Sequence, residues 1–327
     1  MPGKGKSIRS ILVFILILCP LTATSVWSDT IHVGESIGSD TTWTAAGNDH
    51  IVVDSLRVEP GAILTIEDGC NVHFEQGVYL SVDGTLNAPG TPGGGILFTR
   101  RDVGDAWYGL QFNSGSDGTL QYCTVEHATG GSAIYANSAF PTIEHCTLRN
   151  CQYGIRATNV SPVLSVSNTI QDNIYAGLYF TGCTNPSISN QIITGHTNTY
   201  GAIRMASTGE FHIGTGNVVT GNSWGLTMDM NSYPDAASSG NIPMSGNTND
   251  DGIQVNGGGT TTSIPWRDVE ADYIVTTTPS IQSTGTLTIE DGCTVRFESG
   301  RTIYTYGILN APGTPGGGIL FTRRDVG

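Results

Sequence analysis

A short unit recurs along the chain every 21 to 27 residues from Gly109 to Val255. Each unit has a small residue, an apolar residue, an arbitrary residue and a second apolar residue. The units are GLQF at Gly109, AIYA at Ala133, GIRA at Gly154, GLYF at Gly177, AIRM at Ala202, GLTM at Gly225 and GIQV at Gly252. Alternation with a period of two indicates strands, and the fixed recurrence indicates a solenoid of stacked strands. A helical repeat would instead place apolar residues three and four apart.

A second column supports the same register. An apolar residue also recurs between the units, at Val125, Leu148, Ile170, Ile193, Val219 and Met244. The residues three positions after these are, in the same order, Ala128, Cys151, Asn173, His196, Asn222 and Asn247. Four of these six positions are Asn or His. In a coil of stacked strands, amide side chains in one column hydrogen-bond to the turns above and below. We therefore predict an asparagine ladder, with His196 replacing an Asn rather than binding a metal.

A longer repeat sets the domain organisation. Leu64–Gly104 returns as Leu287–Gly327 at an offset of 223 residues, with ten differences in 41 positions. We expect residues 64–256 to form the solenoid and residues 257–327 to begin a second, truncated tandem module, less well anchored than the coil before it. Residues 29–63 look irregular, and we expect them to form an N-terminal cap, with Trp43 as a lid over the apolar end.

Residues 1–28 resemble a signal peptide. Lys4, Lys6 and Arg9 precede the apolar run Ile11–Leu18, and small or polar residues follow. A membrane anchor is the alternative, although the run is shorter than the roughly 20 residues that span a bilayer. We therefore expect a secreted or cell-surface protein, associated with membranes only through this signal.

The composition is acidic and limits the partners. The chain has 14 Lys and Arg against 28 Asp and Glu, a formal charge of −14, and its only lysines are Lys4 and Lys6. Such a surface repels nucleic-acid phosphates and anionic lipids. We expect no nucleic-acid partner.

Six cysteines lie outside the signal peptide, at Cys70, Cys123, Cys146, Cys151, Cys183 and Cys293. Their spacing does not fit a zinc site, and we expect no metal and no cofactor. Cys123 and Cys146 fall at the same place in consecutive turns, close enough for a disulfide. Stacked free thiols are the alternative, and we favour them slightly.

At this point the chain resembles the right-handed parallel β-helix proteins of the pectate-lyase-like superfamily. The resemblance rests on the recurring unit, on endings such as TIQDN, VVTGN and PMSGN, and on the module GTLNAPGTPGGGILFT. It covers about residues 55–257 and again the tail from about residue 281. It implies an all-β, right-handed parallel β-helix, but the fold hosts lyases, hydrolases, epimerases, tailspikes and adhesins.

The sequence contains no recognisable catalytic site. Inverting hydrolases need carboxylates that converge on one face. The outward column after each closing apolar residue holds a single acid, Glu126, which we expect to pair with Arg149. The Asp250-Asp251 pair and the segment Thr194–Thr197 lack the neighbours that the hydrolases of this superfamily carry. We therefore predict no catalytic residues; the alternative is a polysaccharide lyase or glycoside hydrolase with an unrecognised site.

The arbitrary residue of each recurring unit points outward and defines another column. From the first unit to the last these residues are Gln111, Tyr135, Arg156, Tyr179, Arg204, Thr227 and Gln254. Four of them, Tyr135, Arg156, Tyr179 and Arg204, make a strip of about 15 Å that is able to stack on sugar rings and hold a uronate or sulfate. The alternative is a set of cation–π pairs that only stiffens the sheet. We predict a scaffold that binds extracellular polysaccharide or acts in adhesion; a rigid spacer is a third possibility.

Overall fold

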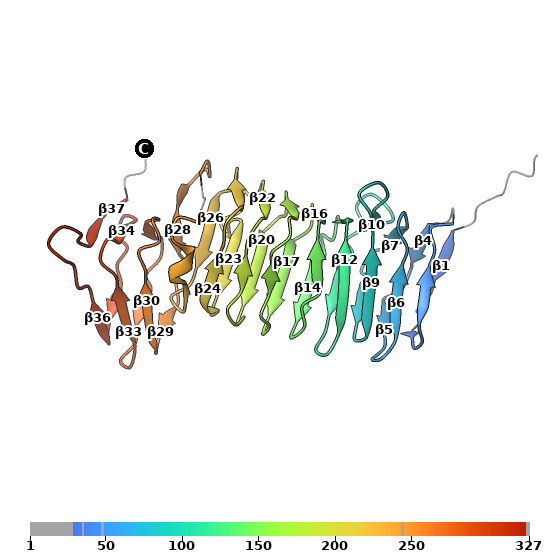
Figure 1. Cartoon of the computed structure of the whole chain (residues 1–327), viewed down its shortest axis with the longest axis horizontal. Coiled ribbons are helices and arrows are strands. Elements are labelled where there is room, and N and C mark those ends of the chain that lie inside the picture. The colour runs from blue at the N-terminus through green and yellow to red at the C-terminus, as the bar shows by residue number, and fades with distance from the viewer. Residues whose placement is uncertain (1–28, 35, 47–48, 243–244, 325–327) are drawn as a thin grey trace, which may run out of the picture.

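The computed structural model describes residues 29–34, 36–46, 49–242 and 245–324. The predicted signal peptide and Met244 lie outside these residues. The described chain forms one elongated coil of parallel strands (Figure 1), with a single short 3-10 segment, η1 (Ala236–Ser238). The predicted all-β, right-handed parallel β-helix is confirmed. No helix in the described part of the chain is long and apolar enough to cross a membrane.

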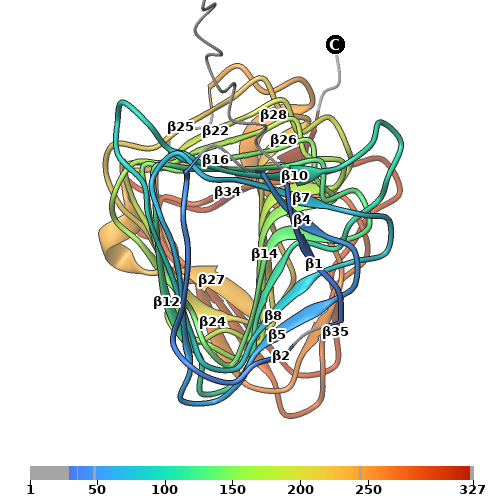
Figure 2. The same cartoon turned by 90° about the vertical axis from the view of Figure 1, so that its right-hand side faces the viewer.

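Three faces enclose the interior, and the coil is triangular when seen along its axis (Figure 2). Sheet A has nine strands: β1 (Thr30–His32), β4 (His50–Val52), β7 (Asn71–Phe74), β10 (Ile96–Arg100), β13 (Cys123–Glu126), β16 (Thr147–Arg149), β19 (Thr169–Gln171), β22 (Ile192–Thr194) and β25 (Val218–Thr220). Sheet B has thirteen: β2 (Ser36–Ile37), β5 (Leu56–Val58), β8 (Leu80–Val82), β11 (Leu110–Phe112), β14 (Ser132–Asn137), β17 (Tyr153–Thr158), β20 (Ala176–Thr181), β23 (Ile203–Ala206), β26 (Trp224–Met228), β28 (Asp250–Val255), β31 (Tyr273–Val275), β34 (Thr294–Phe297) and β37 (Leu320–Arg323).

Shorter sheets complete the coil. One contains β3 (Thr41–Trp43), β6 (Ile63–Ile66), β9 (Thr85–Pro89), β12 (Asp117–Gln121) and β15 (Thr142–Glu144). Another contains β18 (Val163–Leu164), β21 (Ser187–Ile188), β24 (Gly209–Ile213) and β27 (Ser232–Pro234). The C-terminal turns add β29 (Gly259–Thr260), β32 (Ser280–Ile281) and β35 (Tyr304–Thr305), then β30 (Ser263–Trp266), β33 (Thr286–Ile289) and β36 (Ile308–Asn310).

The core is the stack of inward side chains, and the period-two pattern places them correctly. In the first copy of the long repeat the apolar residues that alternate along the strands are at most 2% exposed, namely Leu64, Ile66, Val72, Phe74, Leu80, Val82, Leu86, Ile96 and Phe98. Trp107 stacks on Phe74 at 4.2 Å between ring centroids. Each turn buries its apolar side chains against those of the turns before and after it, and this burial stabilises the coil.

The coil starts earlier than the sequence suggested. Residues 30–63 were expected to be irregular, but strands β1 to β5 lie there and pair in parallel with the turns that follow. These strands are only two or three residues long, so they show little alternation in the sequence. Trp43 belongs to the interior of the first turn, where its ring stacks on His32 at 4.2 Å and on His50 at 4.9 Å.

The second copy of the long repeat continues the same coil, but it joins a different sheet. By the 223-residue offset, β31, β34 and β37 correspond to β4, β7 and β10 of sheet A. In the structure they extend sheet B, through the pairing of β28 with β31. The repeat length is therefore not a whole number of turns.

The junction between the two copies is held by charged groups. Asp250, at the start of β28, contacts Arg296 at 2.8 Å and Arg324 at 3.2 Å, and the Arg324 guanidinium lies 4.8 Å from the Trp224 ring centroid. The core continues past Gly257, where Tyr273, Leu287 and Val295 are fully buried, so the expectation of weaker anchoring is wrong for these turns. It holds for the last turn, in which the apolar side chains of Ile308 and Phe321 are exposed.

The predicted asparagine ladder lies at the corner between sheets A and B. Asn173 Oδ1 accepts a hydrogen bond from the Cys151 N–H at 3.0 Å, and Asn222 Oδ1 accepts one from the His196 N–H at 3.0 Å. Asn247 Oδ1 accepts from the Asn222 N–H at 3.1 Å. His196 occupies the same column, with its Nδ1 3.0 Å from Asn222 Oδ1. A second ladder, which was not predicted from the sequence, lies at the opposite edge of sheet A and consists of Asn168, Gln191 and Asn217.

Candidate functional site

The predicted outward strip forms on sheet B in the expected register. Tyr135 pairs with Arg156, Arg156 with Tyr179, and Tyr179 with Arg204, each on the neighbouring strand. The Arg156 guanidinium carbon lies 5.4 Å from the Tyr135 ring centroid and 5.7 Å from that of Tyr179. Arg204 lies 5.6 Å from the Tyr179 centroid. Arginine and tyrosine therefore alternate at cation–π distance along four consecutive turns.

A second tyrosine column extends this surface, and the sequence analysis missed it. Tyr153, Tyr175 and Tyr200 precede the recurring units and lie beside the strip; Arg204 is 4.5 Å from the Tyr200 centroid. Tyr153 stacks on Tyr179 at 5.5 Å and packs against Tyr175 at 5.3 Å. The sequence does contain a signal for this column, because a tyrosine stands one or two residues before the small residue that opens four of the seven units. We call the combined surface the Tyr/Arg face: Tyr135, Tyr153, Arg156, Tyr175, Tyr179, Tyr200 and Arg204.

The two arginines of the Tyr/Arg face have no carboxylate partner among the described residues. Six other arginines do, with contacts of 3.8 Å or less: Arg57, Arg101, Arg149, Arg267, Arg296 and Arg324. Nε and Nη1 of Arg204 are also buried without an acceptor in the described chain. Two guanidinium groups without a carboxylate partner in the described part of the chain therefore lie on one face of a protein with a formal charge of −14.

The Tyr/Arg face is hollowed at its N-terminal end. A pocket of about 240 Å³ lies between Tyr108, Tyr135, Tyr153 and Arg156, with Gln111 and Gln152 on its walls. Burial raises the pKa of Tyr153 above its ordinary value, so its hydroxyl stays protonated at neutral pH. The pocket therefore offers phenol, amide and guanidinium donors around one opening.

The C-terminal end of the predicted outward column is covered. Thr227 and Gln254 are 1% and 6% exposed, and the Thr227 hydroxyl donates to Gln254 Oε1 at 2.8 Å. Gln254 in turn donates to Thr276 Oγ1 at 3.1 Å. These two positions were predicted to point outward, and they are nevertheless buried, because alternation identifies the side of a strand and not what lies over it.

The carboxylates that the sequence analysis considered for catalysis are engaged in structural contacts. Arg149 binds Glu126 through Nη2 at 2.6 Å and Nε at 2.8 Å, and the Thr99 hydroxyl donates to Glu126 at 3.1 Å. Asp251 accepts from the Asn247 N–H at 3.0 Å, and Asp250 belongs to the junction described above. No group of three metal-binding side chains occurs among the described residues.

The six cysteines outside the predicted signal peptide are free thiols, including Cys123 and Cys146, for which free thiols were favoured. All six are buried, and burial raises the pKa of Cys151 to about 12. The Cys151 thiol therefore stays protonated and unreactive at neutral pH. All six cysteines belong to the hydrophobic core.

Comparison with known proteins gives one match. Residues 90–265, more than half of the chain, match the family model described as the right-handed beta helix region. No curated protein and no protein of known structure gives a significant match. The matched segment includes the whole Tyr/Arg face.

Proposed function

Because the chain belongs to the right-handed β-helix family, we propose that it is an exported scaffold whose Tyr/Arg face binds an acidic polysaccharide. The observation that carries the proposal is the pair of unpaired guanidinium groups, Arg156 and Arg204, set among five tyrosines on one surface. Aromatic faces stack on sugar rings, and an exposed guanidinium group such as that of Arg156 binds carboxylate or sulfate bidentately. Export rests on the signal-like residues 1–28.

The spacing of the strands suits a linear polymer. Successive turns place equivalent side chains about 4.8 Å apart, so Arg156 and Arg204, two turns apart, are separated by about 10 Å. That distance is similar to the length of two sugar units, and it suits a chain that carries charges at regular intervals. The acidic remainder of the protein would confine such a polymer to the Tyr/Arg face by repulsion.

We expect the double variant Arg156→Gln and Arg204→Gln to bind acidic polysaccharide at least tenfold more weakly than the parent. Hydrogen bonds to charged groups contribute about 1.5–3 kcal/mol each, and about 1.4 kcal/mol corresponds to a factor of ten. Isothermal titration with oligogalacturonate, alginate and chondroitin sulfate fragments measures the loss. Arg301→Gln is the matched control, since Arg301 is exposed, has no carboxylate partner in the described chain and lies outside the Tyr/Arg face. Absence of binding by the parent, or an equal loss in the control, contradicts the proposal.

A second variant separates binding from stiffening. Tyr179 lies between both arginines, so Tyr179→Ala removes a stacking surface and two cation–π contacts. If the Tyr/Arg face binds glycan, Tyr179→Ala weakens binding several-fold, since an aromatic contact contributes about 0.5–1.5 kcal/mol beyond the area it buries. If the face only stiffens sheet B, the variant lowers the unfolding midpoint and leaves glycan binding unchanged. Titration and urea denaturation on the same sample distinguish these outcomes.

A further inference from the structure

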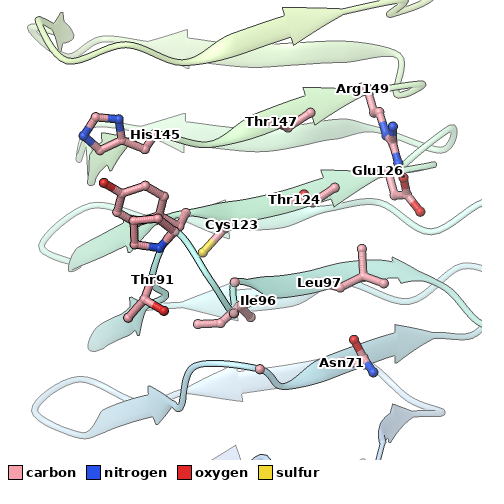
Figure 3. A pocket seen from close by; sticks show the side chains of 15 residues that line it. Asn71, Thr91, Ile96, Leu97, Cys123, Thr124, Glu126, His145, Thr147 and Arg149 are labelled. Carbon is pink, nitrogen blue, oxygen red and sulfur yellow. Dashed lines mark hydrogen bonds and ion pairs between the residues drawn. The ribbon is translucent and has the colours of Figure 1, made fainter.

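A separate groove crosses sheet A on the N-terminal half of the coil (Figure 3). It has a volume of about 520 Å³ and runs over β7, β10, β13 and β16. Its floor is made by the outward side chains Leu97, Thr124 and Thr147, and His145 stands at one side. The ring of Tyr122, which also lines the groove, stacks on that of His145. This volume is within the usual range for small-molecule sites.

The loop that overhangs the groove is held in place by one carboxylate. Asp68 accepts hydrogen bonds from the Thr91 N–H at 2.8 Å, the Thr91 hydroxyl at 2.6 Å and the Gly95 N–H at 2.6 Å. The hydrogen bond from the Thr91 hydroxyl, followed by those from the two backbone amides, lowers the pKa of Asp68, which is therefore ionised at neutral pH. The wall of the groove is thus fixed before any ligand arrives.

The floor presents free hydroxyl groups at a regular spacing. Thr124 and Thr147 are direct partners on β13 and β16, so their side chains are about 4.8 Å apart. Neither hydroxyl makes a hydrogen bond within the described chain, and both residues are partly exposed. Each hydroxyl is one donor and an acceptor available to a ligand.

The residues that line the groove include two aromatic rings and one carboxylate–guanidinium pair. The Tyr122 and His145 rings are 4.6 Å apart and nearly parallel, with His145 exposed to solvent. At the other end Glu126 and Arg149 neutralise each other, since Nη2 and Nε of Arg149 both donate to Oε2 of Glu126. An anion or cation entering the groove would find no free countercharge, whereas an uncharged ring with many hydroxyl groups would find both stacking surfaces and hydrogen-bond partners.

We propose that this groove binds a neutral sugar residue and that it is a second carbohydrate site, independent of the Tyr/Arg face. The hydroxyls of Thr124 and Thr147 hydrogen-bond to sugar hydroxyls, and the exposed ring of the Tyr122–His145 stack packs against a sugar face. Since it carries no net charge, the groove selects neutral units, whereas the Tyr/Arg face selects acidic ones.

The test uses uncharged gluco-, xylo-, manno- and galacto-oligosaccharides as probes, with binding followed by NMR titration of the full chain. The parent is expected to bind at least one of them. The double variant Thr124→Val and Thr147→Val keeps side-chain shape and β-propensity but removes both hydroxyls, and it should bind about tenfold more weakly. Thr169→Val is the matched control, because Thr169 is the next residue of the same column and lies outside the groove. The control should bind as the parent does.

The Arg156→Gln and Arg204→Gln variant separates this proposal from the preceding one. It should lose acidic polysaccharide and keep neutral oligosaccharide with unchanged affinity. The neutral site is wrong if the parent binds none of the probes, if Thr169→Val loses as much affinity as the double threonine variant, or if the arginine variant abolishes neutral binding.

Discussion

Asn222→Leu is expected to lower the free energy of unfolding by about 3–5 kcal/mol, because it removes the residue that makes the most hydrogen bonds in the asparagine ladder. Asn222 is fully buried. Its Oδ1 accepts from the backbone N–H of His196 at 3.0 Å and lies 3.0 Å from the His196 Nδ1, and its Nδ2 donates to the carbonyls of Ile193 and Thr220, each at 3.1 Å. Leucine fills a similar volume, so the loss comes from buried polar groups left without partners, at about 1–3 kcal/mol each.

Urea denaturation followed by circular dichroism measures the effect of Asn222→Leu. Thr220→Val, two residues earlier on the same turn, is the control, since its exposed side chain makes no hydrogen bond within the described chain. Its effect should stay within about 0.5 kcal/mol, as for most surface substitutions. A loss below about 1 kcal/mol for Asn222→Leu would show that water or neighbouring groups replace the amide, and that the ladder contributes little.

The ladder was predictable because it follows from one fixed offset. An amide three residues after an inward apolar residue, repeated at the period of the coil, has few other uses. The second ladder was equally accessible. Asn168, Gln191 and Asn217 stand two residues before Ile170, Ile193 and Val219, which is the offset at which Cys123 and Cys146 were recognised. Extending that column by one turn would have revealed it.

The functional surface was only partly predictable. Strand alternation placed Tyr135, Arg156, Tyr179 and Arg204 on one side, and the pairing register confirms their adjacency. The tyrosines of the second column lie at or before the start of the strands, where the backbone turns and period two does not apply. The groove on sheet A was not predicted, because its wall is a loop that Asp68 holds from more than 20 residues away in the chain. Strand alternation gives no information about such a contact.

The position of the second long repeat shows what local pattern does not specify. Both copies form the same turns, but the register between β26 and β28 shifts near Trp224 and Leu226, before the second copy begins. Near-identical sequences lie on sheet A in one copy and on sheet B in the other, so the sequence of a strand does not by itself determine which sheet it joins.

His196 is expected to make the coil lose about 3 kcal/mol of stability as the pH falls from 6.5 to 4. Burial lowers the pKa of His196 from 6.5 to about 4, against smaller opposing effects of Asn222 and Asp172. The geometry agrees: Asn173 Nδ2 donates to Nε2 at 3.2 Å, while Nδ1 lies 3.0 Å from Asn222 Oδ1. Protonation would set an Nε2–H against the Asn173 amide N–H.

The direction follows from proton binding. Above pH 6.5 the imidazole is neutral in both states and the full stability is present; below 6.5 the unfolded chain takes up a proton that the folded chain refuses until the pH reaches about 4. His196→Asn restores the usual ladder residue and removes this titration, while His50 and His127, whose pKa values are also lowered chiefly by burial, titrate equally in both proteins. Urea midpoints at pH 7, 5.5 and 4 measure the difference. If the parent and His196→Asn lose stability in parallel over this range, the imidazole does not carry the acid sensitivity of the ladder.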